Sequence, residues 1–157
     1  GGSALASHLG GELSYHLWTW ARSSGQGAVF GPDCPYRCFP ARPDTVRKPS
    51  VSFVRWDRMP DGRIPIDSFS IRPDFAGLVV PPQDSAVELQ VRLADYRVAL
   101  IPLVWVVHSI ARAVTEYRPE AAPVQATGAA VLNGDPVLPG FRLRVSDLFQ
   151  FLRPTAP

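Results

Sequence analysis

The sequence predicts an α/β protein of the α+β type, in which a mixed β-sheet carries an N-terminal helix and one further helix. Leucines recur near the helical period of about 3.6 residues at the start of the chain, which is typical of an amphipathic helix. A run of mainly branched residues at 103–107 is typical of a central strand covered on both faces. The predicted elements follow one another as helix, strands, helix and strand, and this order favours a sheet with helices packed on it.

The N-terminal half begins with a helix expected at residues 5–22, because Leu9, Leu13 and Leu17 share one face and Ser3 can cap the start. Ser and Gly at 23–27 end this helix. Short strands are expected at 28–31, 36–39 and 51–54, with a loop at 40–49, a helical turn at 56–60 and a surface loop at 61–72.

The C-terminal half begins with a strand at 75–80, followed by a helix that Asp84 caps and that continues to about Ala99. Strand 103–107 follows, and His108 is expected to cap a turn between it and a hairpin partner at 113–118. Short strand-like segments are expected at 123–127 and 129–132, and residues 139–143 with a terminal turn at 146–149 close the domain. A single domain at 4–152 follows, with residues 1–3 interpreted as a cloning remnant and 153–157 as a tail.

Composition favours one compact core without metals or disulfides, since 46% of the 157 residues are hydrophobic. The formal charge of +2 is too small to indicate a nucleic-acid or membrane partner by itself. The longest apolar run, 100–107, is far shorter than the roughly 20 residues of a membrane helix. No export segment precedes the first helix, so a cytoplasmic protein without a membrane partner is predicted.

Cys34 and Cys38 are expected as reduced thiols, roughly 13 Å apart along a strand.

Several local motifs recur in an order that is more specific than any one of them. They are DTVRKPSVSFV at 44–54, PDFAGLVVPPQD at 73–84, Tyr96, VWVV at 104–107, YRP at 117–119 and LPGF at 138–141. With them, residues 46–149 resemble the Uma-type restriction endonuclease family of the PD-(D/E)XK nuclease superfamily. The resemblance implies a restriction-endonuclease-like core and a metal-dependent DNA hydrolase.

Nucleases of this superfamily need two carboxylates that converge on a divalent metal, with a lysine nearby. The family takes them from an R-x-P-D-V strand, a P-D-L-V-V-E-V strand and the helix that follows. The resemblance places these positions at Ser50, Leu78 and Arg92, and none holds the family residue. A hydroxyl brings no negative charge, and leucine cannot bind a hard cation. We therefore expect no metal cofactor and no catalysis, with Ser50 and Leu78 on neighbouring strands, their side chains on the same side of the sheet, and Arg92 reaching toward them.

The alternative is a functioning endonuclease with a rearranged site that binds Mg²⁺ or Mn²⁺. Asp74 could supply a carboxylate, although it lies about 13 Å from Leu78 along the same strand. Asp84 and Glu88 lie at the entry of the second helix, where a capping role and a solvent-facing role are the simpler interpretation. DNA-binding candidates are Arg47, Lys48, Arg55 and Arg58, since they border the family site. Neighbouring acidic residues allow a second interpretation, an internally paired surface. The partners considered are DNA, bound weakly and without sequence preference, and a second copy of the chain.

Overall fold

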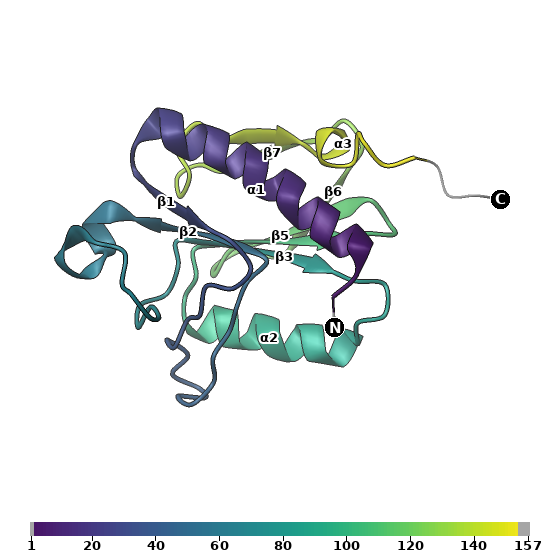
Figure 1. Cartoon of the computed structure of the whole chain (residues 1–157). Helices are drawn as coiled ribbons and strands as arrows, with labels where there is room; N and C mark the ends of the chain where they lie inside the picture. The colour runs from purple at the N-terminus through teal and green to yellow at the C-terminus, as the bar shows by residue number, and fades with distance from the viewer. Residues whose placement is uncertain (1, 154–157) are drawn as a thin grey trace.

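The computed structural model describes residues 2–153 and contains a six-stranded mixed sheet with helices on both faces (Figure 1). The elements in chain order are α1 (Ala4–Ser24), β1 (Gly27–Phe30), β2 (Val51–Arg55), the 3-10 turns η1 (Trp56–Arg58) and η2 (Pro60–Gly62), β3 (Phe75–Val80), α2 (Ala86–Val98), β4 (Leu103–His108), β5 (Ala113–Tyr117), β6 (Val124–Thr127), β7 (Val131–Asn133), β8 (Arg142–Arg144) and α3 (Val145–Leu148). The predicted fold class is confirmed.

The six strands follow the order β1-β2-β3-β4-β5-β6, and only β3 and β4 are parallel. Helix α2 connects these two strands, because parallel neighbours need a crossover connection. Both strands are buried along almost their whole length. The remaining pairs are antiparallel, and β7 and β8 form a separate two-stranded sheet.

Helix α1 covers one face of the sheet, on the side where β7 and α3 also lie (Figure 1). The Ser3 hydroxyl accepts a hydrogen bond from the Ala6 N–H, and Gly25 ends the helix with a φ of 67°. Leu9, Leu13 and Leu17 are fully buried, as their spacing predicts, in a core that also contains Trp105. The helical prediction is therefore confirmed within two residues at each end.

Helix α2 covers the opposite face and packs Leu93 and Tyr96 into a second core with Leu78 (Figure 1). The N-cap of this helix is Ser85, not Asp84. The Ser85 hydroxyl accepts hydrogen bonds from the N–H groups of Val87 and Glu88. Asp84 is still in the preceding turn, where its N–H donates to the carbonyl of Pro81. The predicted cap was wrong by one position.

Three other local predictions need correction. Residues 36–39 form no strand, because only Tyr36 pairs, with Arg47 and Phe69, and prolines flank the segment at 35 and 40. The strand expected at 129–132 begins later, as β7, after Gly128 with its positive φ, and β8 was not predicted as a strand. His108 ends β4 and hydrogen-bonds with the Thr115 hydroxyl at 2.9 Å, so it caps no turn.

Other expectations concern the cysteines, the membrane and the chain ends. Cys34 and Cys38 are free thiols, both half-buried. Within residues 2–153, no helix has the length and apolar character needed to cross a membrane. The predictions for residue 1 and for residues 154–157 lie outside the described residues.

Candidate functional site

A cavity of about 380 Å³ lies beside the end of β3 and the first half of α2. Leu78 of β3 and Arg92 of α2 both line it, so the structure brings together two of the three positions that the sequence pattern singled out. Arg42 and Arg47, from the loop before β2, complete its basic side. Leu78 itself is 2% exposed and belongs to the core beneath α2.

Ser50 lies next to Leu78 in the sheet but faces a different environment. The β2–β3 register sets Val51 opposite Gly77, so Ser50 immediately precedes that pair. Its hydroxyl accepts a hydrogen bond of 3.0 Å from the Val79 N–H, and the side chain lines a cavity beside α1. The prediction that the two side chains lie on the same side of the sheet was wrong, because Ser50 lines a cavity on the α1 face and Leu78 lines one on the α2 face.

Asp95 of α2 holds two of the cavity arginines. It is buried, and its carboxylate accepts from Nε and Nη2 of both Arg42 and Arg47 at 2.7 to 3.2 Å. The hydrogen bond from Arg42, followed by that from Arg47, lowers the pKa of Asp95. Arg92 is half-buried and makes no side-chain hydrogen bond or ion pair with any residue from 2 to 153.

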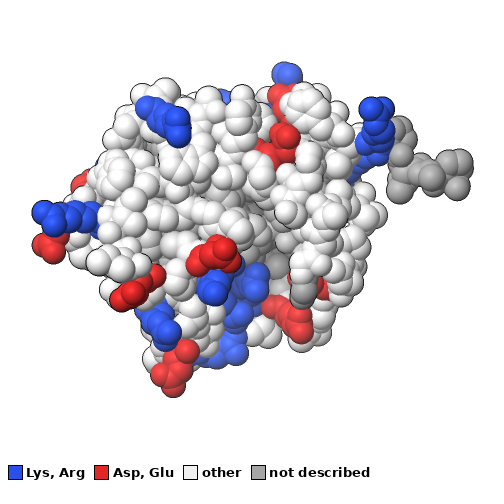
Figure 2. Space-filling view, in the orientation of Figure 1, with Lys and Arg blue, Asp and Glu red and all other residues white. Residues whose placement is uncertain are grey.

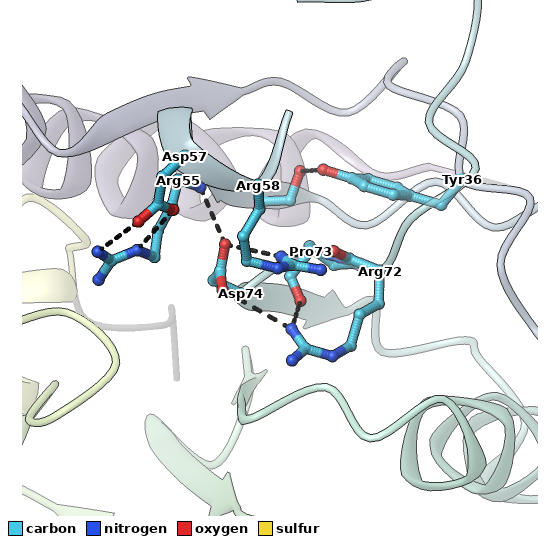
Figure 3. A network of polar contacts seen from close by, with 8 residues as sticks. Tyr36, Arg55, Asp57, Arg58, Arg72, Pro73 and Asp74 are labelled. Atoms are coloured by element: carbon cyan, nitrogen blue, oxygen red, sulfur yellow. Dashed lines mark hydrogen bonds and ion pairs between the residues drawn. The ribbon is translucent and has the colours of Figure 1, made fainter. Parts of the chain in front are cut away.

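Asp74 lies directly before β3, at the opposite end of this strand from the cavity residues Leu78 to Val80. Figure 3 shows its contacts with Arg58 and Arg72. Its buried carboxylate accepts from the Arg55 N–H and from Arg58 Nη1, each at 2.9 Å, and lies 3.7 Å from Arg72. Strand β3 continues without interruption from Phe75 to Val80, so Asp74 and Leu78 do not meet. Within the described residues, no group of three or more His, Cys, Asp and Glu side chains could hold a metal ion.

Three of the four predicted DNA-binding cations are in ion pairs. Arg47 pairs with Asp95, Arg55 with Asp57, and Arg58 with Asp74. Lys48 is exposed. Figure 2 shows Lys and Arg side chains gathered in the lower middle of the view, in front of α2, with acidic side chains beside them. The ion pairs of Arg47, Arg55 and Arg58 agree with the second interpretation of the sequence, an internally paired surface.

Sequence reasoning missed Arg42 and Asp95. The only signal in the sequence for an ion pair was the position of Asp95 on α2, directly before the buried Tyr96. A charged side chain that is buried needs a partner of opposite charge. A second buried pair was also missed: the Tyr36 hydroxyl lies 2.7 Å from that of Ser52, and burial raises the pKa of Tyr36. Burial likewise raises the pKa of the Cys38 thiol to about 11, which argues against a reactive thiolate.

Comparison with known proteins supports the same fold. A crystal structure described as a putative nuclease belonging to DUF820, from Anabaena variabilis ATCC 29413, is similar at 18% sequence identity with a TM-score of 0.81. The similarity covers 95% of this chain and 82% of that one. No curated protein matches the sequence. The model of the Uma2 family, described as "Putative restriction endonuclease", matches residues 1–146, which extends the resemblance over α1. The chain therefore belongs to the Uma2 family of restriction endonuclease-like proteins.

Proposed function

We propose that this Uma2 protein does not cleave DNA by the metal-dependent route of its superfamily and acts by binding instead. The observation that carries the proposal is Leu78. Its fully apolar side chain is 2% exposed, and the sequence resemblance aligns it with the second carboxylate of the family pattern.

The donor set at these positions does not fit Mg²⁺ or Mn²⁺. Both ions are hard cations that bind through carboxylate, carbonyl and water oxygens. Leu78 offers no oxygen, and the Ser50 hydroxyl is neutral and hydrogen-bonded to the Val79 N–H. Arg92 adds a positive charge beside the place where a cation would lie. Each of these differences acts against metal binding.

A rearranged metal site could use Asp74 of the same strand, because Asp84 and Glu88, which line the cavity, are exposed and form no group of three or more possible ligands within the described residues. The Asp74 carboxylate is bound by Arg58 and by the Arg55 N–H, and these contacts would have to break before it could approach a metal. Two charge-assisted hydrogen bonds oppose that rearrangement. The proposal of an inactive protein therefore requires no rearrangement of the structure, whereas the functioning endonuclease with a rearranged site requires these contacts to break.

The DNA-binding role proposed here is weak and independent of sequence. Lys48 and the partly exposed arginines can contact phosphates, but pairing with Asp57, Asp74 and Asp95 reduces the charge that they present. Titrations at about 50 mM and 200 mM salt test this role, because affinity carried by phosphate contacts falls steeply with salt. Equal affinity at both concentrations would argue for a protein partner.

Cleavage and metal binding are tested together. We expect calorimetric titration with Mg²⁺ or Mn²⁺ to give no heat of binding, and plasmid DNA to remain uncut above background. The variant that combines Ser50→Asp, Leu78→Glu and Arg92→Lys provides the matched gain-of-function test, with Arg92→Lys alone as its control. Metal-dependent cleavage by the unmodified protein, lost in a folded Asp74→Ala variant, would refute the proposal and identify the rearranged site.

A further inference from the structure

We propose that the cavity beside Leu78 and Arg92 binds a phosphate group directly, through arginine and without a metal. The phosphate would belong to a small phosphomonoester or to the terminal phosphate of a nucleic-acid strand. The inference rests on the proposed loss of the metal site and names the ligand chemistry that the altered site would accept.

The first support is the set of arginines and their free donors. Arg92 has no partner among residues 2–153, although it is half-buried. Arg42 and Arg47 use Nε and Nη2 for Asp95, and their Nη1 groups make no hydrogen bond to another described residue. A guanidinium carries five N–H donors, so each arginine keeps some for a ligand. Guanidinium groups bind phosphate in a bidentate manner.

The second support is preorganisation. Asp95 is buried and holds both loop arginines in ion pairs of 2.9 Å and 2.7 Å, so their side chains are already ordered before any ligand arrives. A ligand therefore loses less affinity to the ordering of these side chains. Arg92 lies one turn of the same helix before Tyr96, whose ring is packed in the core. Helix α2 thus positions all three cations.

The third support is the charge of the cavity. Arg42, Arg47 and Arg92 line the cavity with three positive charges against two negative charges from Asp84 and Glu88, a formal net charge of +1, and the buried Asp95 behind the arginines compensates one further charge. Asp84 and Glu88 are exposed, so solvent and salt screen them more strongly than the half-buried Arg47 and Arg92. The substitution by Leu78 removes the negative charge that would repel an anion.

The fourth support is the size and lining of the cavity. Its volume of about 380 Å³ falls at the lower end of the range for small-ligand sites, about 300 to 1,000 Å³. Leu78, Val80 and Leu89 add apolar surface beside the arginines. Low-dielectric surroundings strengthen a charge-assisted hydrogen bond relative to water.

Binding is tested with the whole chain in EDTA, using three probes. They are inorganic phosphate, a short oligonucleotide with a 5′-phosphate, and the same oligonucleotide without it. We expect Arg92→Ala to weaken binding of the phosphate-bearing probes roughly tenfold or more, since a hydrogen bond to a charged group contributes about that factor. Arg92→Gln, which keeps more of the side chain, should behave alike. Arg97→Ala is the matched control, because Arg97 is an exposed arginine of α2 at another cavity.

The results distinguish a strand terminus from a small phosphomonoester as the source of the phosphate. They also distinguish failure of the phosphate-binding proposal from failure of the proposed loss of metal-dependent cleavage. Preference for the phosphorylated oligonucleotide over inorganic phosphate would identify a strand terminus, and comparable affinity for both would identify a small phosphomonoester. Absence of phosphate binding, or equal losses in Arg92→Ala and Arg97→Ala, would overturn this inference while leaving the proposed loss of cleavage intact. Phosphate binding that appears only with Mg²⁺ would instead contradict the proposed loss of the metal site.

Discussion

Replacement of Asp74 by alanine tests whether this carboxylate is a structural anchor or a metal ligand. In the structure its side chain is 7% exposed and accepts from the Arg55 N–H and from Arg58 Nη1 at 2.9 Å. Arg72 lies 3.7 Å away (Figure 3). These contacts tie the start of β3 to the end of β2 and to η1. We therefore expect Asp74→Ala to destabilise the fold.

The magnitude follows from burial. Removal of one partner from a buried ion pair costs about 3–5 kcal/mol, because the other charge stays buried without compensation. The Arg58 and Arg72 side chains are 27% and 30% exposed, so water can reach both, and the lower limit applies. We expect a loss of about 3 kcal/mol from a free energy of unfolding on the order of 5–15 kcal/mol.

Urea denaturation measures this loss. With a slope of about 2 kcal/mol per M, the midpoint should fall by about 1.5 M. Asp57→Ala is the matched control, because Asp57 pairs with the neighbouring Arg55 but is 65% exposed, and its midpoint should move far less. An Asp74→Ala midpoint equal to that of the unmodified protein would refute the anchoring role.

The elements that local pattern determines were predictable from the sequence. Leu9, Leu13 and Leu17 fixed the buried face of α1, and the apolar run of β4 fixed a strand covered on both faces. The structure reproduces β3 at the predicted bounds. In these segments the hydrophobic periodicity and the intrinsic secondary-structure propensity of the residues indicate the same element. The secondary structure can therefore be predicted without knowledge of distant contacts.

Predictions failed where distant contacts decide. Tyr36 pairs with Arg47 and Phe69, so the conformation of its segment depends on residues that the local pattern does not contain. The ion pairs of Arg47 and Arg58, which were predicted to contact DNA because they border the family site, were not foreseen, since their carboxylate partners lie 48 and 16 positions away. Ion pairs over such separations follow from tertiary packing.

The candidate site was predictable only in part, for a related reason. The order of the family motifs singled out Leu78 and Arg92, and both side chains line one cavity in the structure. The side chain of Ser50 lies just outside β2, where strand alternation no longer dictates its direction, and its hydroxyl binds the neighbouring backbone. Chain order can therefore identify a site position without fixing where its side chain points.

Two further predictions concern packing and pH. Gly77→Ala should cost about 1–3 kcal/mol in urea denaturation, because its Cβ would lie 2.7 Å from Val51 Cγ1 and 2.8 Å from Leu13 Cδ2. Gly31→Ala, with no atom within 4 Å, is its control, and equal midpoints would contradict the close packing of α1 on the sheet. Burial lowers the pKa of His108, so the unfolded chain, with a pKa of about 6.5, binds a proton more readily than the folded chain. The free energy of unfolding should therefore decrease as the pH falls through about 6.5 toward the lower folded value, and His108→Gln should reduce this dependence. An unchanged dependence between pH values of about 7.5 and 5.5 in the variant would show that another group titrates in this range.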